Sequence, residues 1–136
     1  MHVKSIDHIH IYAADPAASV EFFCRHFGAQ KVFETKNAHH QQVSILQVGG
    51  QGIALSEYPP GTPPKTPALS EAEAREGMGP AAGIMHLGFN VEDVAAAVRE
   101  LRDAGVRVHT EPDEAYGTTF AYCSTPDGVV IELTQY

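Results

Sequence analysis

The feature that most constrains the fold is an internal repeat, in which the second half of the chain matches the first at an offset of 78 residues. His8 and His86 are separated by this offset. With the same offset, the run VGGQGIALSEY at 48–58 lies on PDGVVIELTQY at 126–136 and aligns its apolar residues. Such a duplication predicts two structural modules of the same topology.

Each half contains an alternating polar and apolar run, then an amphipathic helix, then three strand-like runs. Asp15 and Asp93 occupy equivalent N-cap positions. Gly28 and Gly105 end the two helical patterns. The predicted strands cover 4–12, 30–36, 42–48 and 51–58 in the first half and 84–90, about 106–110, 118–124 and 129–135 in the second, with a tight turn at Gly49-Gly50.

These patterns predict an α+β fold, in which two paired βαβββ modules form a curved eight-stranded mixed sheet with helices outside. The length of 136 residues fits one domain, with module 1 at 1–58 and module 2 at 84–136. The segment 59–83 between them holds six of the nine prolines, so it cannot be regular sheet. Within it, Ser70 to Glu73 resembles a capping box for a short helix ending at Gly77. We favour a surface linker over a substrate lid.

Composition excludes several classes of partner. The formal net charge of -8 leaves no basic stripe, so we expect no nucleic acid and no membrane partner. The N-terminal residues lack the apolar run of a signal peptide, which predicts a cytoplasmic protein. Cys24 and Cys123 are too few for a disulfide framework and are expected to be reduced core thiols.

Three residues are candidate metal ligands because they point away from the face that meets the helices. Apolar neighbours mark that face in each strand, so His8, His86 and Glu132 project to the other side. An unpaired carboxylate in an interior would be costly, and a bound cation would remove the cost. Two imidazoles and one carboxylate suit Fe²⁺ best, although Mn²⁺, Zn²⁺, Ni²⁺ or Co²⁺ would also bind there. The competing interpretation is that these are ordinary hydrogen-bonded strand residues.

The repeat adds one observation about this triad. The residue of the first half that corresponds to Glu132 is Ala54. A duplicated ancestor with four symmetric ligand positions would therefore retain three of them here.

The sequence resembles the vicinal oxygen chelate superfamily, which includes glyoxalase I, methylmalonyl-CoA epimerase, extradiol dioxygenases and fosfomycin-resistance transferases. The resemblance rests on IDHIHIYAADPAASVEFF, on HLGFNVEDVAAAVRELRDAGV and on the ending STPDGVVIEL. It implies metal ligands at His8, His86 and Glu132. The fourth ligand of glyoxalase I and of the epimerase falls on Ala54, and this departure argues against both activities.

The resemblance leaves the chemistry open. We favour an extradiol-type dioxygenase, because this class uses two His and one carboxylate on Fe²⁺ and has a Tyr ten residues before the ligand Glu, where Tyr122 lies. The signature's upstream His is missing, so His10 is the candidate base beside Glu132 and Tyr122. The competing interpretation of His10 is an exposed or hydrogen-bonded strand residue.

The alternative is an isomerase or lyase of glyoxalase or epimerase type, which acts through a metal-stabilised enolate. A fosfomycin-resistance transferase ranks lower, because its cationic residues beyond the last ligand have no counterpart. A metal-free drug-binding protein is a further alternative. We expect a small-molecule substrate and, because sheet edges are exposed, a homodimer whose modules pair within one chain or across two.

Overall fold

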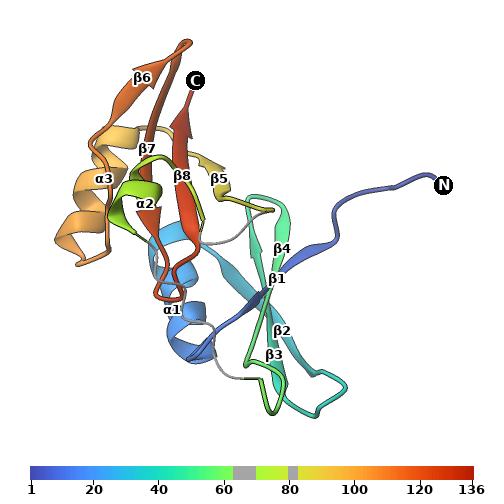
Figure 1. Cartoon of the computed structure of the whole chain (residues 1–136). Coiled ribbons are helices and arrows are strands. Elements are labelled where there is room, and N and C mark those ends of the chain that lie inside the picture. The colour runs from blue at the N-terminus through green and yellow to red at the C-terminus, as the bar shows by residue number, and fades with distance from the viewer. Residues whose placement is uncertain (63–69, 80–82) are drawn as a thin grey trace. The chain divides into compact units, whose positions relative to one another are not determined.

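The computed structural model describes residues 1–62, 70–79 and 83–136 (Figure 1). The chain divides into two compact units, Met1–Lys65 and Thr66–Tyr136.

Unit 1 is a four-stranded mixed sheet with one helix (Figure 1). Its elements are β1 (His8–Tyr12), α1 (Pro16–Phe27), β2 (Gln30–Lys36), β3 (Gln42–Val48) and β4 (Gln51–Ser56). The strand order is β1-β4-β3-β2, with β1 parallel to β4 and the other pairs antiparallel. The predicted helix and all four predicted strands are therefore present.

Unit 2 repeats this topology. Its elements are α2 (Glu71–Arg75), β5 (Leu87–Asn90), α3 (Val94–Asp103), β6 (Asp113–Ala115), β7 (Thr118–Ser124) and β8 (Val130–Gln135), and its strand order is β5-β8-β7-β6. The register is also repeated, since His10 pairs with Ala54 on the parallel strands of unit 1 and Gly88 pairs with Glu132 in unit 2. The offset of 78 residues thus holds in three dimensions, and the eight strands form two equivalent four-stranded sheets.

Local capping explains where the two long helices begin. The Asp15 carboxylate accepts a hydrogen bond from the backbone N–H of Ala18 at 3.1 Å, and Asp93 accepts one from Ala96 at 2.8 Å. Each carboxylate satisfies an amide that has no partner within its helix. Both predicted N-caps are therefore confirmed.

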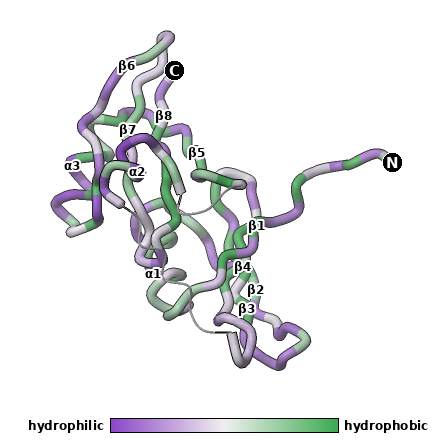
Figure 2. Tube along the Cα trace, in the orientation of Figure 1, coloured by the Kyte–Doolittle hydropathy of each residue, from purple (hydrophilic) through white to green (hydrophobic). Residues whose placement is uncertain are grey.

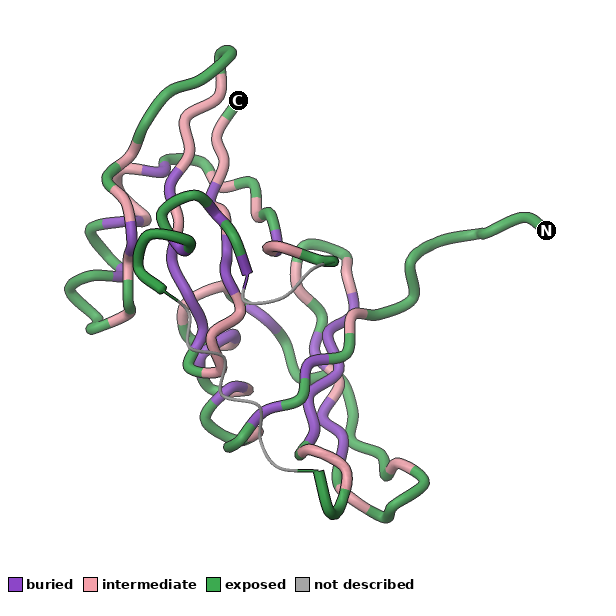
Figure 3. The backbone as a smooth tube through the Cα atoms, viewed as in Figure 1, coloured by how far each residue is buried: buried purple, intermediate pink, exposed green. Residues whose placement is uncertain are grey.

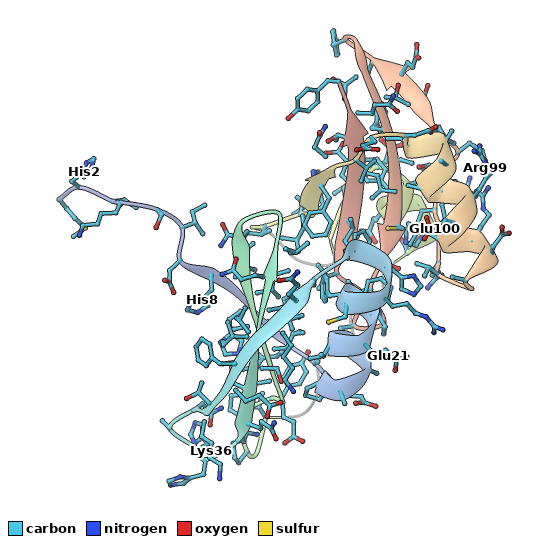
Figure 4. All side chains as sticks on the ribbon, turned by 180° about the vertical axis from the view of Figure 1, so that it is seen from behind. His2, His8, Glu21, Lys36, Arg99 and Glu100 are labelled. Atoms are coloured by element: carbon cyan, nitrogen blue, oxygen red, sulfur yellow. The ribbon has the colours of Figure 1, made fainter. Side chains whose placement is uncertain are left out.

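The core of each unit lies between its helix and its sheet. In unit 1, α1 packs against β2, β3 and β4, and in unit 2, α3 packs against β7 and β8. The strands contribute Leu55 and Leu133, whose burial stabilises the fold by about 2 kcal/mol each. Figure 2 shows apolar and polar residues side by side on α3, and Figure 4 shows Arg99 and Glu100 projecting from it.

The prediction of a strand at 106–110 is wrong. The second strand of unit 2 is β6 at Asp113–Ala115, and the segment 106–110 forms only an isolated bridge between Val108 and Cys123. The Tyr122 backbone N–H donates to the Thr110 side-chain oxygen at 2.8 Å, so a hydroxyl takes the place of a ladder carbonyl. Figure 3 shows β6 exposed and the second half of β7 buried.

Two strands also begin later than predicted, at His8 and at Leu87 rather than at residues 4 and 84. The residues before His8 are exposed, so burial of their side chains does not stabilise them as a strand. No helix among the described residues is long and apolar enough to span a membrane.

Candidate metal centre

His86 and Glu132 lie together in unit 2, as the triad hypothesis requires of two of its members. His86 immediately precedes β5, and Glu132 is on β8, paired with Gly88 of β5. The neighbours of Glu132 on its strand, Ile131 and Leu133, are buried, so alternation places Glu132 on the opposite face of the sheet. The His86 Nε2 atom is 3.3 Å from Glu132 Oε2, and both side chains are partly exposed.

The hydrogen bond to Gly77 shows which ring nitrogen of His86 carries a hydrogen. The Nδ1 atom is 2.8 Å from the backbone oxygen of Gly77, which can only accept, so Nδ1 carries a proton. In a neutral ring, Nε2 then has a lone pair, and this lone pair faces a carboxylate oxygen. A proton or a metal ion between Nε2 and Oε2 is needed to remove the repulsion.

The spacing fits a metal ion. Nitrogen and oxygen ligands lie about 2.0–2.2 Å from a metal such as zinc, so two adjacent ligands are about 2.9–3.4 Å apart. The separation of 3.3 Å between Nε2 and Oε2 falls in this range. His86 and Glu132 can therefore occupy neighbouring positions around one cation.

Tyr122 completes this cluster. Its hydroxyl donates a hydrogen bond to Glu132 Oε1 at 3.0 Å, and its ring lies 5.8 Å from that of His86. Burial raises the pKa of Tyr122 to about 12, and the hydrogen bond to Glu132 and the charges of Glu132 and Glu76 add to the rise. The Tyr122 hydroxyl thus stays protonated at neutral pH and donates to Oε1 of Glu132. The other carboxylate oxygen, Oε2, remains available to bind a cation.

An open cavity of about 640 Å³ adjoins Tyr122 within unit 2. Its lining combines the aromatic ring of Phe120 with polar side chains from α2 and from the segment before β6, among them Arg75, Glu76 and Thr110. A cavity of this size accommodates a small molecule.

The other predicted residues lie on β1 in unit 1. His8 and His10 share one face of the strand, as predicted, and their ring centres are 6.2 Å apart. The His8 Nδ1 atom is 2.7 Å from Asp7 Oδ2. This contact leaves Nε2 of His8 for a metal, in the manner of a carboxylate that orients a histidine ligand. Figure 4 labels His8 at the start of β1.

His10 is engaged differently. Its Nε2 atom is 2.8 Å from the Ser56 hydroxyl oxygen. Burial lowers the pKa of His10, and the neighbouring charge of His8 lowers it further. Ala54, which pairs with His10 across the parallel strands, is fully buried.

Within each unit, the described residues contain no group of three His, Cys, Asp or Glu that could hold a metal ion by itself. The structure thus brings together His86, Glu132 and Tyr122 in one unit and His8 and His10 in the other. The three-ligand site that joins the two sets stays a prediction.

Sequence reasoning missed two groups that orient the predicted ligands. Asp7, which contacts His8, could have been noticed because it directly precedes that residue. The Gly77 carbonyl, which accepts from His86, has no signature in the sequence beyond the end of the predicted short helix.

Comparisons with known proteins agree with this architecture. The sequence model of the glyoxalase/bleomycin resistance protein/dioxygenase superfamily matches residues 5–133. The uncharacterized protein YaeR of Escherichia coli K12 is 32% identical over 98% of this chain and 97% of its own length. The uncharacterized protein YwkD of Bacillus subtilis 168 is 31% identical over 99% of both chains. Glyoxalase I of Saccharomyces cerevisiae is 25% identical over 96% of this chain and 44% of the yeast protein.

Two solved structures share the fold at low sequence identity. TnmS3, an antibiotic-binding protein from Streptomyces sp. CB03234, has a TM-score of 0.72 with 22% identity and covers 99% and 98% of the two chains. The fosfomycin resistance protein FosX of Listeria monocytogenes, in complex with Mn(II) and sulfate, has a TM-score of 0.69 with 14% identity and covers 99% and 94%.

Proposed function

Because the chain belongs to the glyoxalase/bleomycin resistance protein/dioxygenase superfamily, we propose that it is a metal-dependent enzyme acting on a small substrate through two adjacent oxygens. The proposed ligands are His8, His86 and Glu132. The observation that carries the proposal is the 3.3 Å approach of His86 Nε2 to Glu132 Oε2, while Nδ1 and Oε1 are both engaged elsewhere. The metal, with Fe²⁺ as first candidate, would supply Lewis acidity toward the substrate oxygens.

The surrounding residues have defined roles in this proposal. Tyr122 holds the Glu132 carboxylate by one oxygen, so the other oxygen remains directed toward His86. The cavity beside Tyr122 would receive the part of the substrate that extends away from the metal. Its mixed aromatic and charged lining favours a polar small molecule over a hydrocarbon.

An extradiol-type dioxygenase is the first candidate for the reaction. Two histidines and one carboxylate are the ligand set of non-haem Fe(II) oxygenases. In this scheme Tyr122 uses its single O–H to orient the Glu132 carboxylate, and His10 accepts a substrate proton. The contact of His10 with Ser56 supports a fixed ring orientation for that role.

An isomerase or lyase is the second candidate, and the similarity to yeast glyoxalase I favours it. Such an enzyme moves a proton beside a carbonyl, so it needs a carboxylate base near the substrate. Ala54 cannot serve, and Glu132 would have to act both as ligand and as base.

The similarity of fold to an antibiotic-binding protein supports a third candidate, a binding protein without chemistry. Metal analysis separates it from the two enzymes. Protein purified without chelator should carry about one divalent ion per site, His86→Ala should lose the ion, and a control at the exposed His39, His39→Ala, should keep it. A wild-type protein without metal would overturn the enzyme proposal.

Oxygen uptake then separates the two reactions. If the dioxygenase candidate is correct, the Fe²⁺-loaded protein consumes oxygen with at least one member of a catechol panel. Exchange of substrate hydrogen for solvent deuterium without oxygen uptake would instead support the isomerase or lyase.

The active assembly is proposed to be a homodimer. The strand orders leave β1, β2, β5 and β6 at sheet edges, and open edges favour pairing with a second chain. Mixing His8→Ala with Glu132→Ala tests whether the modules pair across chains. A site built across two chains regains metal in the mixed dimer, whereas a site within one chain stays empty in every mixture.

A further inference from the structure

We infer that residues 70–79, which precede the candidate metal centre in the chain, position His86 for metal binding. This segment comprises α2 and the turn that follows it. The inference rests on the proposed function, because it assigns a role to residues that would not touch the metal. It replaces the interpretation of this part of 59–83 as a surface linker.

Contacts of Ser70 and Glu71 anchor the N-terminal end of this segment. Ser70 caps α2 by accepting a hydrogen bond from the Glu73 backbone N–H, and its hydroxyl donates to the Glu73 carboxylate, so the N-cap of the predicted short helix is present. Glu71 then contacts the segment between α3 and β6, where its carboxylate lies 3.2 Å from His109 Nδ1 and 3.3 Å from Arg107. The His109 side chain is fully buried, so this contact ties α2 to a rigid position.

Two backbone hydrogen bonds fix the way in which α2 ends. The Gly77 N–H donates to the Ala74 carbonyl at 3.1 Å, and the Met78 N–H donates to the Glu73 carbonyl at 2.9 Å. These two bonds with a positive φ of 68° at Gly77 form a Schellman motif. The motif fixes the Gly77 peptide, and its carbonyl therefore meets His86 Nδ1 at 2.8 Å.

Gly77 also fits closely against the side chain of Tyr122. A Cβ atom at Gly77 would lie 2.5 Å from Cε1 of Tyr122 and 2.9 Å from its hydroxyl oxygen. Only glycine permits this approach. Gly79 is similarly confined, since a Cβ there would lie 2.6 Å from the Met85 carbonyl oxygen. Segment 70–79 thus lies against the Tyr122 side chain and against the backbone of Met85, the residue before His86.

The consequence is a fixed tautomer and a fixed ring orientation. A carbonyl that accepts from Nδ1 keeps the proton on that atom and leaves Nε2 free to bind the metal. The contacts that hold this carbonyl in place involve Glu71, Ala74 and Gly77. None of these residues is a proposed metal ligand. The metal affinity of the site should therefore depend on this segment.

The chain offers a matched control for a test at Gly77. Gly105 follows α3 with a φ of 78°, and it has the same pair of bonds, from its own N–H to Arg102 and from Val106 to Leu101. A Cβ at Gly105 meets nothing within 4 Å among the described residues. Gly77→Ala and Gly105→Ala thus carry the same backbone strain, and only Gly77→Ala collides with Tyr122.

The experiment compares Mn²⁺ or Co²⁺ affinity of the full-length variants by titration, with circular dichroism to verify folding. We expect Gly77→Ala to bind metal about 10-fold or more weakly than Gly105→Ala, in the range typical of lost outer contacts to a metal ligand. Glu71→Gln, which weakens the anchor without a collision, should lower affinity several-fold relative to Glu100→Gln on the exposed face of α3. Equal affinities within both pairs would overturn the inference.

A second readout does not need the metal. In metal-free protein at mildly alkaline pH, ¹⁵N nuclear magnetic resonance of His86 should show a proton on Nδ1 in the wild type and in Gly105→Ala, and a mixture of tautomers in Gly77→Ala. A wild type that binds no metal but shows this pattern would refute the proposed function and keep the positioning role. A His86 tautomer that is unchanged by Gly77→Ala would refute the positioning role.

Discussion

The two units have the same strand order and the same parallel register, yet they present different chemistry at equivalent positions. In unit 2, Glu132 meets His86 and Tyr122, and α2 adds a carbonyl that orients the histidine. In unit 1, the equivalent of Glu132 is the buried Ala54, and His10 binds Ser56 instead. A duplicated backbone therefore fixes where side chains can meet, and the side chains themselves decide what each copy can bind.

The two cysteines give the largest expected difference between the units. Burial raises the pKa of Cys123 in unit 2 to about 12, from an ordinary value of 9.0, which lowers its thiolate fraction about 1000-fold. Cys24 in unit 1 is partly exposed. Alkylation of the folded protein, followed by peptide mass spectrometry, should label Cys24 and leave Cys123 unmodified, with Cys123 gaining reactivity as the pH rises toward 12. Labelling of both at one rate would show that unit 2 opens readily.

The next comparison removes one equivalent core residue from each unit. Leu55 and Leu133 are related by the repeat and are both almost fully buried. Each change to Ala should lower the free energy of unfolding by about 3 kcal/mol, because it leaves a cavity in a packed core. Urea denaturation followed by circular dichroism measures the loss. A single shifted transition in both variants would mean that the units unfold together, and two separate transitions would mean that they unfold independently.

A substitution at Ala54 tests the vacated position directly. Ala54→Glu should destabilise the protein by about 2 kcal/mol, because a larger side chain is forced into a closed core. Ala54→Gln has the same size without the charge and should cost less, since burial of a carboxylate adds a desolvation penalty. If Mn²⁺ restores the stability of the Glu variant alone, the position can still serve as a ligand. Equal stability of all three proteins would show that this position is not closed.

The smallest expected effects concern the helix caps. Asp15→Ala and Asp93→Ala each remove one carboxylate that accepts a backbone N–H, so each should cost about 1 kcal/mol. Thermal unfolding of the two single variants and of the double variant measures these losses. Because the caps lie in different units, their effects should add, and a double variant far from the sum would indicate coupling between the units.

The amino-acid sequence by itself determined the elements whose hydrogen bonds are local. The caps at Asp15 and Asp93, the Gly49-Gly50 turn and the short helix after Ser70 follow from neighbouring residues, and all are present. The alternation on β1 and β8 also predicted which face carries His8 and Glu132, because side chains in a strand point to opposite faces in turn. The repeat predicted the shared topology because two similar sequences form the same elements in the same order.

The tertiary structure alone decided the contacts between segments that are far apart in the sequence. The Thr110 hydroxyl accepts the Tyr122 N–H, and the second strand of unit 2 lies at 113–115 instead of 106–110. The Gly77 carbonyl meets His86 at the end of α2, which Glu71 ties to the buried His109. A backbone carbonyl carries no mark in the sequence, since every residue has one, and its direction is set by packing. The sequence therefore predicted the candidate ligands His86 and Glu132, which the structure places side by side, but it did not predict the carbonyl that orients His86.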